Sequence, residues 1–109
     1  MKQLQPADAV ALCANGRAPL LLDVREDWEL ATAAIHIDGV AVRHVPMGRI
    51  PEQFTELDPA QPIVCICHHG MRSAQVGGFL ERQGFSAIYN LAGGIDAWSD
   101  QVDSGVPRY

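Results

Sequence analysis

Short apolar runs alternate with helical patterns along this chain. Two of the runs, Leu20 to Val24 and Ile63 to Ile66, are almost entirely apolar and have the length of a strand. Such runs are typical of parallel strands that are buried on both faces of a sheet. Val40 to Val45 and Ala87 to Leu91 also have strand composition. These four segments are the predicted strands.

Helical patterns fill the segments between the strands. Pro6 can begin a first helix, which Asn15-Gly16 would end. Ser73 to Gln83 predicts a second helix, with Gly84 as its stop. We expect shorter helical segments around Trp28, within residues 47–58 and from Ile95 to Trp98, with both tryptophans as packing anchors. The residues expected to face inward from the two longer helices are Ala9, Val10, Leu12, Cys13, Val76, Phe79 and Leu80.

Strands that alternate with helices indicate a mostly parallel sheet that is covered on both sides. The chain has 109 residues, which fits one compact domain, and contains no repeat, linker or low-complexity tract. Hydrophobic residues make up 48% and charged residues 19%, a mixture typical of globular proteins. We therefore expect a single α/β domain over residues 1–109, with about five strands and helices on both faces.

The charge balance bears on the choice of partner. The chain has eight basic and 13 acidic residues, which gives a formal net charge of -5. Such a surface repels nucleic-acid phosphates, and no basic run opposes this. The composition therefore predicts no nucleic-acid partner, although a small anion can still bind where the local field is positive.

The beginning of the chain and its cysteines indicate the compartment. The first six residues lack the apolar stretch of a secretory signal, and no apolar run approaches the roughly 20 residues that cross a bilayer. The odd number of cysteines (Cys13, Cys65 and Cys67) is a poor basis for a disulfide framework. We therefore expect a cytoplasmic protein with free thiols and no membrane partner.

The segment that carries chemistry runs from Cys67 to Ser73, between a buried strand and a helix. In open α/β sheets, ligands bind just beyond the carboxyl ends of the strands. The unpaired amides and the dipole of the following helix make this place an anion site and favour a thiolate. Gly70 lets the loop curl inward, and Arg72 adds a positive charge with several donors. The pattern predicts an activated cysteine inside an anion-binding loop.

The other two cysteines suggest plainer roles. Cys65 lies within the strand and Cys13 on a helix, where a thiol packs as a small hydrophobic group. Cys65, Cys67 and the two histidines that follow could also be read as metal ligands. Zinc needs four convergent ligands, however, and a cysteine pair that runs from a strand into a loop does not readily converge. We therefore expect no metal site.

The motif Cys-x-x-Gly-x-Arg-Ser at Cys67 resembles the active-site loop of the rhodanese family. Three other segments resemble family motifs in the same order: Leu22-Asp23-Val24-Arg25-Glu26, His44-Val45-Pro46 and Leu91 to Trp98 with its Gly-Gly-x-x-x-Trp pattern. Together they cover the chain from Leu20 to Trp98. One segment departs from the family, because Ile35-His36-Ile37-Asp38-Gly39 lacks the usual glycine before histidine and has aspartate in place of proline. This departure concerns the local backbone there and not the loop at Cys67.

The resemblance implies a sulfurtransferase that carries sulfur as a persulfide on Cys67 and needs no cofactor. The donor would be thiosulfate or a similar anion, and the acceptor cyanide or a cellular thiol. The residues that the resemblance assigns to substrate binding are His68, His69, Gly70, Met71, Arg72 and Ser73. Asp23 and Arg25 would form an ion pair that supports the loop. Whether the side chains of His68 and His69 take part, or only their amides, stays open.

Two other functions compete with this interpretation. Related cysteine-dependent phosphatases have five residues between cysteine and arginine, whereas four separate Cys67 from Arg72. A smaller loop suits a sulfur atom better than a phosphate. The second alternative is a persulfide relay or regulatory module that serves one protein partner, and retention of Cys67, Gly70 and Arg72 argues against an inert module.

Overall fold

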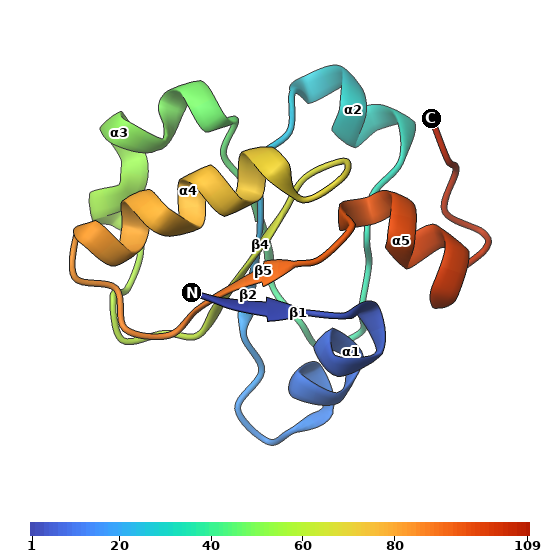
Figure 1. Cartoon of the computed structure of the whole chain (residues 1–109), viewed down its shortest axis with the longest axis horizontal. Coiled ribbons are helices and arrows are strands. Elements are labelled where there is room, and N and C mark those ends of the chain that lie inside the picture. Colours follow the sequence, from blue (N-terminus) through green and yellow to red (C-terminus); the bar gives the residue numbers. More distant parts are fainter.

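The computed structural model describes all residues, 1–109, as one α/β domain. Five parallel strands form a single sheet in the order β1-β5-β4-β2-β3 (Figure 1). The strands are β1 (Lys2–Leu4), β2 (Leu20–Asp23), β3 (Val42–His44), β4 (Ile63–Ile66) and β5 (Ile88–Leu91). The predicted fold class is confirmed, and β4 lies at the centre of the sheet, as its unbroken apolar sequence indicated.

Helices connect the strands. They are α1 (Pro6–Ala14), α2 (Asp27–Thr32), α3 (Ile50–Gln53), α4 (Met71–Arg82) and α5 (Gly94–Gln101), with short 3₁₀ turns at Met47–Arg49 and Phe54–Glu56. Pro6 occupies the first turn of α1, and Asn15 follows its last residue, as predicted. Helix α4 begins two residues earlier than the sequence suggested, directly after Gly70.

One strand was not predicted from the sequence. Strand β1 has only three residues, and its first two are exposed. It pairs in parallel with β5, so that Leu4 lies opposite Leu91. A segment this short has no clear alternation of apolar and polar residues, and its pairing with a distant strand decides its structure.

Each face of the sheet has its own core. Helices α3 and α4 cover one face, while α1 and α5 cover the other (Figure 1). Alternate residues of β4 divide between the faces, because Ile63 and Cys65 belong to the first core, whereas Val64 and Ile66 belong to the second. Cys67 continues the first series, so the chain leaves the sheet on the side of α4.

Helix α4 packs closely on the sheet at one glycine. A Cβ atom on Gly77 would lie 3.2 Å from Cγ2 of Ile88, whereas one on Gly78 would meet only the flexible end of Arg82. The close approach of α4 to the sheet therefore requires glycine at Gly77 and not at Gly78.

Two apolar residues are more exposed than the sequence predicted. Val10 was expected on the buried face of α1, but 40% of it is exposed, since α1 turns Pro6 and Ala9 inward instead. Trp28 was expected to be a packing anchor, but 62% of it is exposed. The buried residue of α2 is Glu29, one position after Trp28. Its carboxylate is turned inward, where it binds Arg72 and Tyr109. Trp98 is buried, as predicted.

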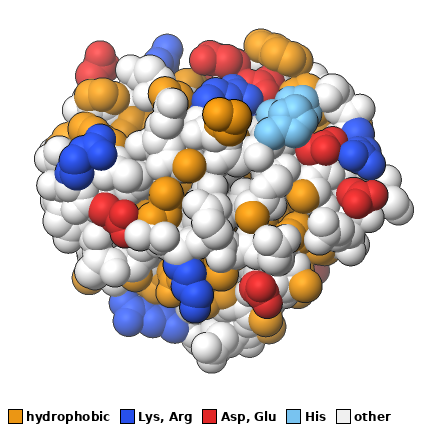
Figure 2. Space-filling model, in the orientation of Figure 1, with side chains coloured by type: hydrophobic (Ala, Val, Ile, Leu, Met, Phe, Trp, Pro, Cys, Tyr) orange, Lys and Arg blue, Asp and Glu red, His pale blue; other side chains and the backbone are white.

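The surface shows no large region of one charge on the face seen in Figure 2. Acidic and basic side chains alternate there, and histidine side chains lie among them. No helix of the chain combines the length and the apolar character that crossing a bilayer requires.

Candidate active site

The loop after β4 encloses the sulfur of Cys67. Only 1% of Cys67 is exposed, and its Sγ atom accepts a hydrogen bond from the backbone N–H of Gly70 at 3.0 Å. The Oγ atom of Ser73, in the first turn of α4, lies 3.2 Å from the same sulfur. The structure therefore brings together three residues that the sequence assigned to one site.

Gly70 gives the loop its shape. Its φ is +99°, a left-handed conformation that side chains rarely adopt. A Cβ atom at this position would also lie 3.2 Å from the backbone nitrogen of Gly93 and 3.3 Å from the carbonyl oxygen of Leu91. Glycine is therefore required both by the turn and by the contact with the chain after β5.

The carbonyl groups of the loop bind the beginning of α5. The N–H of Ile95 donates to the oxygen of Cys67 at 2.9 Å, and the N–H of Asp96 donates to the oxygen of His68 at 3.1 Å. Gly94 has a φ of +61°, and a Cβ atom there would overlap both carbonyl groups. The same loop directs the N–H of Gly70 towards the sulfur. The first-turn amides of α4 lie at the same place and favour negative charge.

Arg72 forms an ion pair with an acidic residue, a role that its sequence position allowed without identifying the partner. Its two terminal nitrogens donate to the two carboxylate oxygens of Glu29, at 2.6 and 2.8 Å. This hydrogen-bonded pairing holds the pKa of Glu29 at about 2 and raises that of Arg72. Arg72 had been expected to face an incoming anion. In the structure its guanidinium pairs with Glu29 instead, and 35% of its side chain is exposed.

Arg25 is fully buried and contacts the backbone of Glu29. Its guanidinium pairs with Asp23 at 2.7 Å and also donates to the carbonyl oxygens of Glu29 and Ala33. Burial alone would lower the pKa of Arg25, but the hydrogen bonds and the charge of Asp23 outweigh it and keep the pKa raised. The ion pair predicted for Asp23 and Arg25 is therefore present, and it lies beneath α2.

Tyr109 closes this network. Its hydroxyl donates to Glu29 at 2.7 Å and accepts from Arg25 at 2.9 Å. Its ring stacks on His68, with the centroids 4.0 Å apart, and lies edge-on to Trp28. Trp28 is thus exposed because it packs against the tail of the chain rather than the core.

Sequence reasoning missed Glu29, Tyr109 and Asn90. Glu29 carries a weak signal, since it stands three positions after Glu26, and the two side chains form a capping box at the start of α2. Asn90 is a polar residue inside an apolar strand, which is a signal for a buried hydrogen bond. Nothing in the sequence marks Tyr109.

Burial keeps Cys65 chemically inert. Burial, with a smaller contribution from Cys67, raises the pKa of Cys65 to about 12, so that it stays a neutral thiol near pH 7. Cys65 also belongs to the apolar core, which agrees with its predicted packing role. Burial raises the pKa of Cys13 as well. All three cysteines are free.

Three residues beside the loop have the side chains of a metal site. One ligand atom each of His68, His69 and Asp96 lies within 4.8 Å of the others. The two imidazole rings are stacked, however, with an angle of 21° between their planes. Nitrogen lone pairs lie in the ring plane, so two stacked rings do not point them at one ion. Asp96 is also paired with Arg108. This geometry opposes a metal centre.

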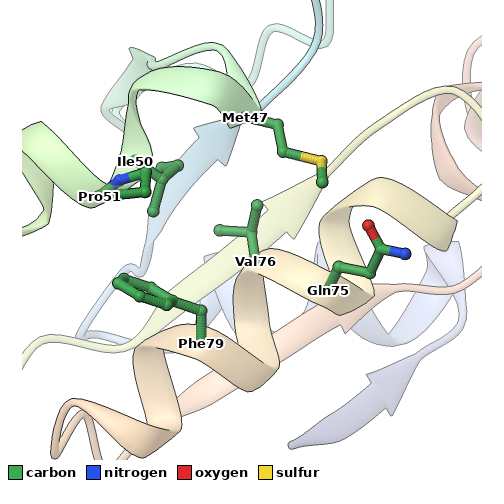
Figure 3. Close-up of a pocket in the computed structure, with 6 residues that line it drawn as sticks. All are labelled: Met47, Ile50, Pro51, Gln75, Val76 and Phe79. Atoms are coloured by element: carbon green, nitrogen blue, oxygen red, sulfur yellow. The ribbon is translucent and has the colours of Figure 1, made fainter.

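An apolar hollow of about 150 Å³ lies between α3 and α4 (Figure 3). Its six lining residues are Met47, Ile50, Pro51, Gln75, Val76 and Phe79. None of them ionises or acts as a nucleophile, so the hollow has no chemistry of its own.

The fold and the loop together define a class. This is a parallel α/β domain in which a cysteine follows the central strand and lies in a turn whose amide points at the sulfur. Comparison with known proteins agrees: the chain belongs to the rhodanese family, since the Rhodanese-like domain family matches residues 5–101.

Several of the similar proteins are sulfurtransferases by name. A putative sulfurtransferase of Bacillus subtilis, YtwF, is 44% identical over 82 residues, which are 75% of each chain. The thiosulfate sulfurtransferase GlpE of Stutzerimonas stutzeri is 30% identical over 105 residues, 96% of this chain and 91% of the relative. A rhodanese-related protein of Thermoplasma volcanium has a similar structure, with 29% identity, a TM-score of 0.79 and complete coverage of both chains. A general role in sulfur transfer follows.

Substituting Gly94 tests the contact between the loop and α5. We expect Gly94→Ala to lower the free energy of unfolding by about 2 kcal/mol or more, because both the positive φ and the overlap with two carbonyls oppose a Cβ atom. Gly84→Ala is the matched control, since Gly84 has a φ of +93° but no atom within 4 Å of its Cβ position. Urea unfolding measures both variants. Equal losses would show that the contact with the loop contributes nothing beyond the strained backbone.

The ion pair at Glu29 predicts acid sensitivity. Since its pKa is about 2 in the fold and about 4.5 without its partners, ionised Glu29 stabilises the fold above pH 4.5. This contribution is lost as the pH falls from 4.5 towards 2. We expect a loss on the order of 2 kcal/mol, reduced by the solvent exposure of Arg72.

Unfolding measured between pH 2 and 6 tests this expectation. Glu29→Gln should flatten the acid limb of the stability curve, while Glu52→Gln, a change at an exposed residue, should leave it in place. An acid limb in Glu29→Gln as steep as that of the parent would contradict the assignment.

Proposed function

We propose that this domain transfers the outer sulfur of thiosulfate to a thiophilic acceptor through a persulfide on Cys67. The observation that carries the proposal is the environment of the Cys67 sulfur. At the beginning of α4, this sulfur accepts a hydrogen bond from the Gly70 amide at 3.0 Å. Amides that point at a sulfur stabilise it when it is negatively charged. The thiosulfate sulfurtransferase among the relatives supports the choice of donor.

The first step is a displacement at sulfur. The Cys67 thiolate attacks the outer sulfur of thiosulfate, a new S–S bond forms, and the bond to the sulfonate group breaks with its electron pair. Sulfite leaves, and Cys67 holds a persulfide anion. The total charge is the same before and after the step. The loop amides and the α4 dipole stabilise the negative charge on the terminal sulfur.

The second step returns the enzyme to its starting state. Cyanide or a thiolate attacks the terminal sulfur of the persulfide, and the S–S bond to Cys67 breaks. With cyanide the product is thiocyanate, and with a thiolate it is the persulfide of the acceptor. Cys67 is a thiolate again, and no cofactor takes part. Free thiols in all three cysteines suit a reducing compartment such as the cytoplasm.

Arg72 has a supporting role in this proposal. Its guanidinium lies on the first turn of α4, where its charge acts on Cys67, and Glu29 holds it in one orientation. The N–H groups that Glu29 does not bind remain for the sulfonate oxygens of the donor. His68, His69 and Met71 complete the loop, where His68 is fixed by its stack on Tyr109.

Mapping the added sulfur tests the role of Cys67. Incubation with thiosulfate should add one sulfur atom to Cys67 alone, and cyanide should remove it. Cys67→Ser should abolish transfer without unfolding the domain, because serine is close in size. Cys65→Ala and Cys13→Ala are the matched controls and should keep substantial activity. Mass spectrometry of the intact protein and its peptides gives the answer, and a persulfide on Cys65 would refute the proposal.

Substituting Arg72 tests its contact with the donor. Arg72→Ala should raise the KM for thiosulfate roughly ten- to a hundredfold, the equivalent of one lost charged hydrogen bond. The melting temperature should fall as well, because Glu29 is left buried without its partner. Glu29→Gln separates the effects, since it weakens the ion pair but leaves the charge of Arg72. An unchanged KM in Arg72→Ala would exclude a role in binding the donor.

A further inference from the structure

A buried chain of hydrogen bonds lies beneath the Cys67 loop. Ser73 is fully buried and Asn90 is 2% exposed. The Oγ atom of Ser73 is 3.2 Å from the Cys67 sulfur and 2.5 Å from Oδ1 of Asn90. A hydroxyl group has one hydrogen, so Ser73 can donate to only one of these two atoms.

The orientation of the Asn90 amide decides which atom receives the hydrogen. The Nδ2 atom of Asn90 is 3.0 Å from the carbonyl oxygen of Gly70 and 2.9 Å from Oε1 of Gln3. A backbone carbonyl only accepts, so the side of Asn90 that faces Gly70 must be the nitrogen. The oxygen of Asn90 therefore faces Ser73. An amide oxygen also only accepts, so the Ser73 hydroxyl donates to Asn90.

The Cys67 sulfur consequently faces a lone pair of Ser73 and not its hydrogen. The sulfur has one donor, the Gly70 amide, and one acceptor, the Ser73 oxygen. A neutral thiol satisfies both, because it accepts from Gly70 and donates its own hydrogen to Ser73. A thiolate or a persulfide has no hydrogen to donate. It gains a second donor only if the Ser73 hydroxyl rotates away from Asn90.

We propose that Asn90 is a positioning residue which holds the Ser73 hydroxyl away from Cys67 and thereby favours the neutral thiol in the resting protein. This inference rests on the proposed role of Cys67 as the sulfur-carrying nucleophile. As long as Asn90 keeps the hydroxyl, a negatively charged Cys67 has the Gly70 amide as its one hydrogen-bond donor. The Ser73–Asn90 pair thus sets how readily Cys67 ionises.

Two other ionisable groups interact electrostatically with Cys67: Cys65 of β4 and Arg72 of α4. Further ionisable groups lie around the same loop, namely His68 and His69 of the loop itself, Glu29 of α2 and Asp96 of α5. None of them forms a hydrogen bond with Ser73 or Asn90. Substitutions at Ser73 and Asn90 therefore change the hydroxyl donor and leave these charges in place.

The test follows alkylation of Cys67 by iodoacetamide as a function of pH, with the modified peptide identified by mass spectrometry. Asn90→Leu frees the Ser73 hydroxyl to donate to the thiolate, so the midpoint of the pH profile should fall by about one pH unit. Ser73→Ala removes the acceptor of the thiol hydrogen, so its midpoint should fall as well. The double variant should match Ser73→Ala, because Asn90 acts only through the hydroxyl.

Gln3→Ala is the matched control, since Gln3 binds the nitrogen of the same amide and not its oxygen. Its midpoint should stay that of the parent. A rise of the midpoint in Ser73→Ala would overturn the proposal, because it would mean that Ser73 donates to the thiolate in the parent. An unchanged midpoint in Asn90→Leu, or an equal fall in Gln3→Ala, would overturn it too. If Asn90→Leu does not fold, the direction of the change in Ser73→Ala decides.

Alkylation needs no sulfur donor, so this experiment is independent of the sulfur-transfer assay. A parent protein that takes no sulfur on Cys67 would refute the proposed function while the midpoints stayed as expected. Conversely, normal sulfur transfer with a raised midpoint in Ser73→Ala would refute only the role of Asn90.

Discussion

The site depends on one contact, in which the first amides of α5 bind the carbonyl oxygens of Cys67 and His68. A loop that follows a parallel strand has no partner strand to hold its polar groups. Here the beginning of α5 binds the carbonyls, and the same loop turns its amide at Gly70 to the sulfur. The contact is possible only because Gly94 and Gly70 have no side chains. The Gly-Gly segment after β5 therefore shapes the candidate active site, although it contributes no functional group.

Charge around the loop is closely balanced. Arg72 is neutralised by Glu29, and the buried Arg25 by Asp23. Tyr109 links the two pairs, because its hydroxyl bonds to both Glu29 and Arg25. The proposed binding of an anionic donor therefore depends less on net positive charge than on oriented amides and helix dipoles. This agrees with an acidic protein whose proposed substrate carries negative charge.

The loop could be predicted from sequence because its determinants are local. A buried apolar strand, a cysteine, a glycine and a helix follow one another within a few residues, and each obeys a rule of neighbouring positions. The partners of the loop could not be predicted in the same way. Arg72 and Glu29 are separated by 43 positions, and Tyr109 and Arg25 by 84. Such pairs depend on how distant segments meet in the fold, which neighbouring positions do not reveal. For this reason the sequence predicted Trp28 as the packing residue of α2, whereas Glu29 is the residue that α2 turns inward.

Asn90 shows where a departure from a local rule carries information. Strand β5 is otherwise apolar, and an asparagine inside it costs free energy unless its amide finds partners. Asn90 lies opposite Cys65 in the sheet, and Cys65 stands two positions before Cys67 in the chain. From there its amide binds Gly70 and Gln3, and its oxygen binds Ser73. Every polar atom of this side chain is used, and two of its three partners belong to the segment around the sulfur. A residue that only filled the core would be apolar here, so the polarity of Asn90 is best explained by the orientation it imposes on the groups around Cys67.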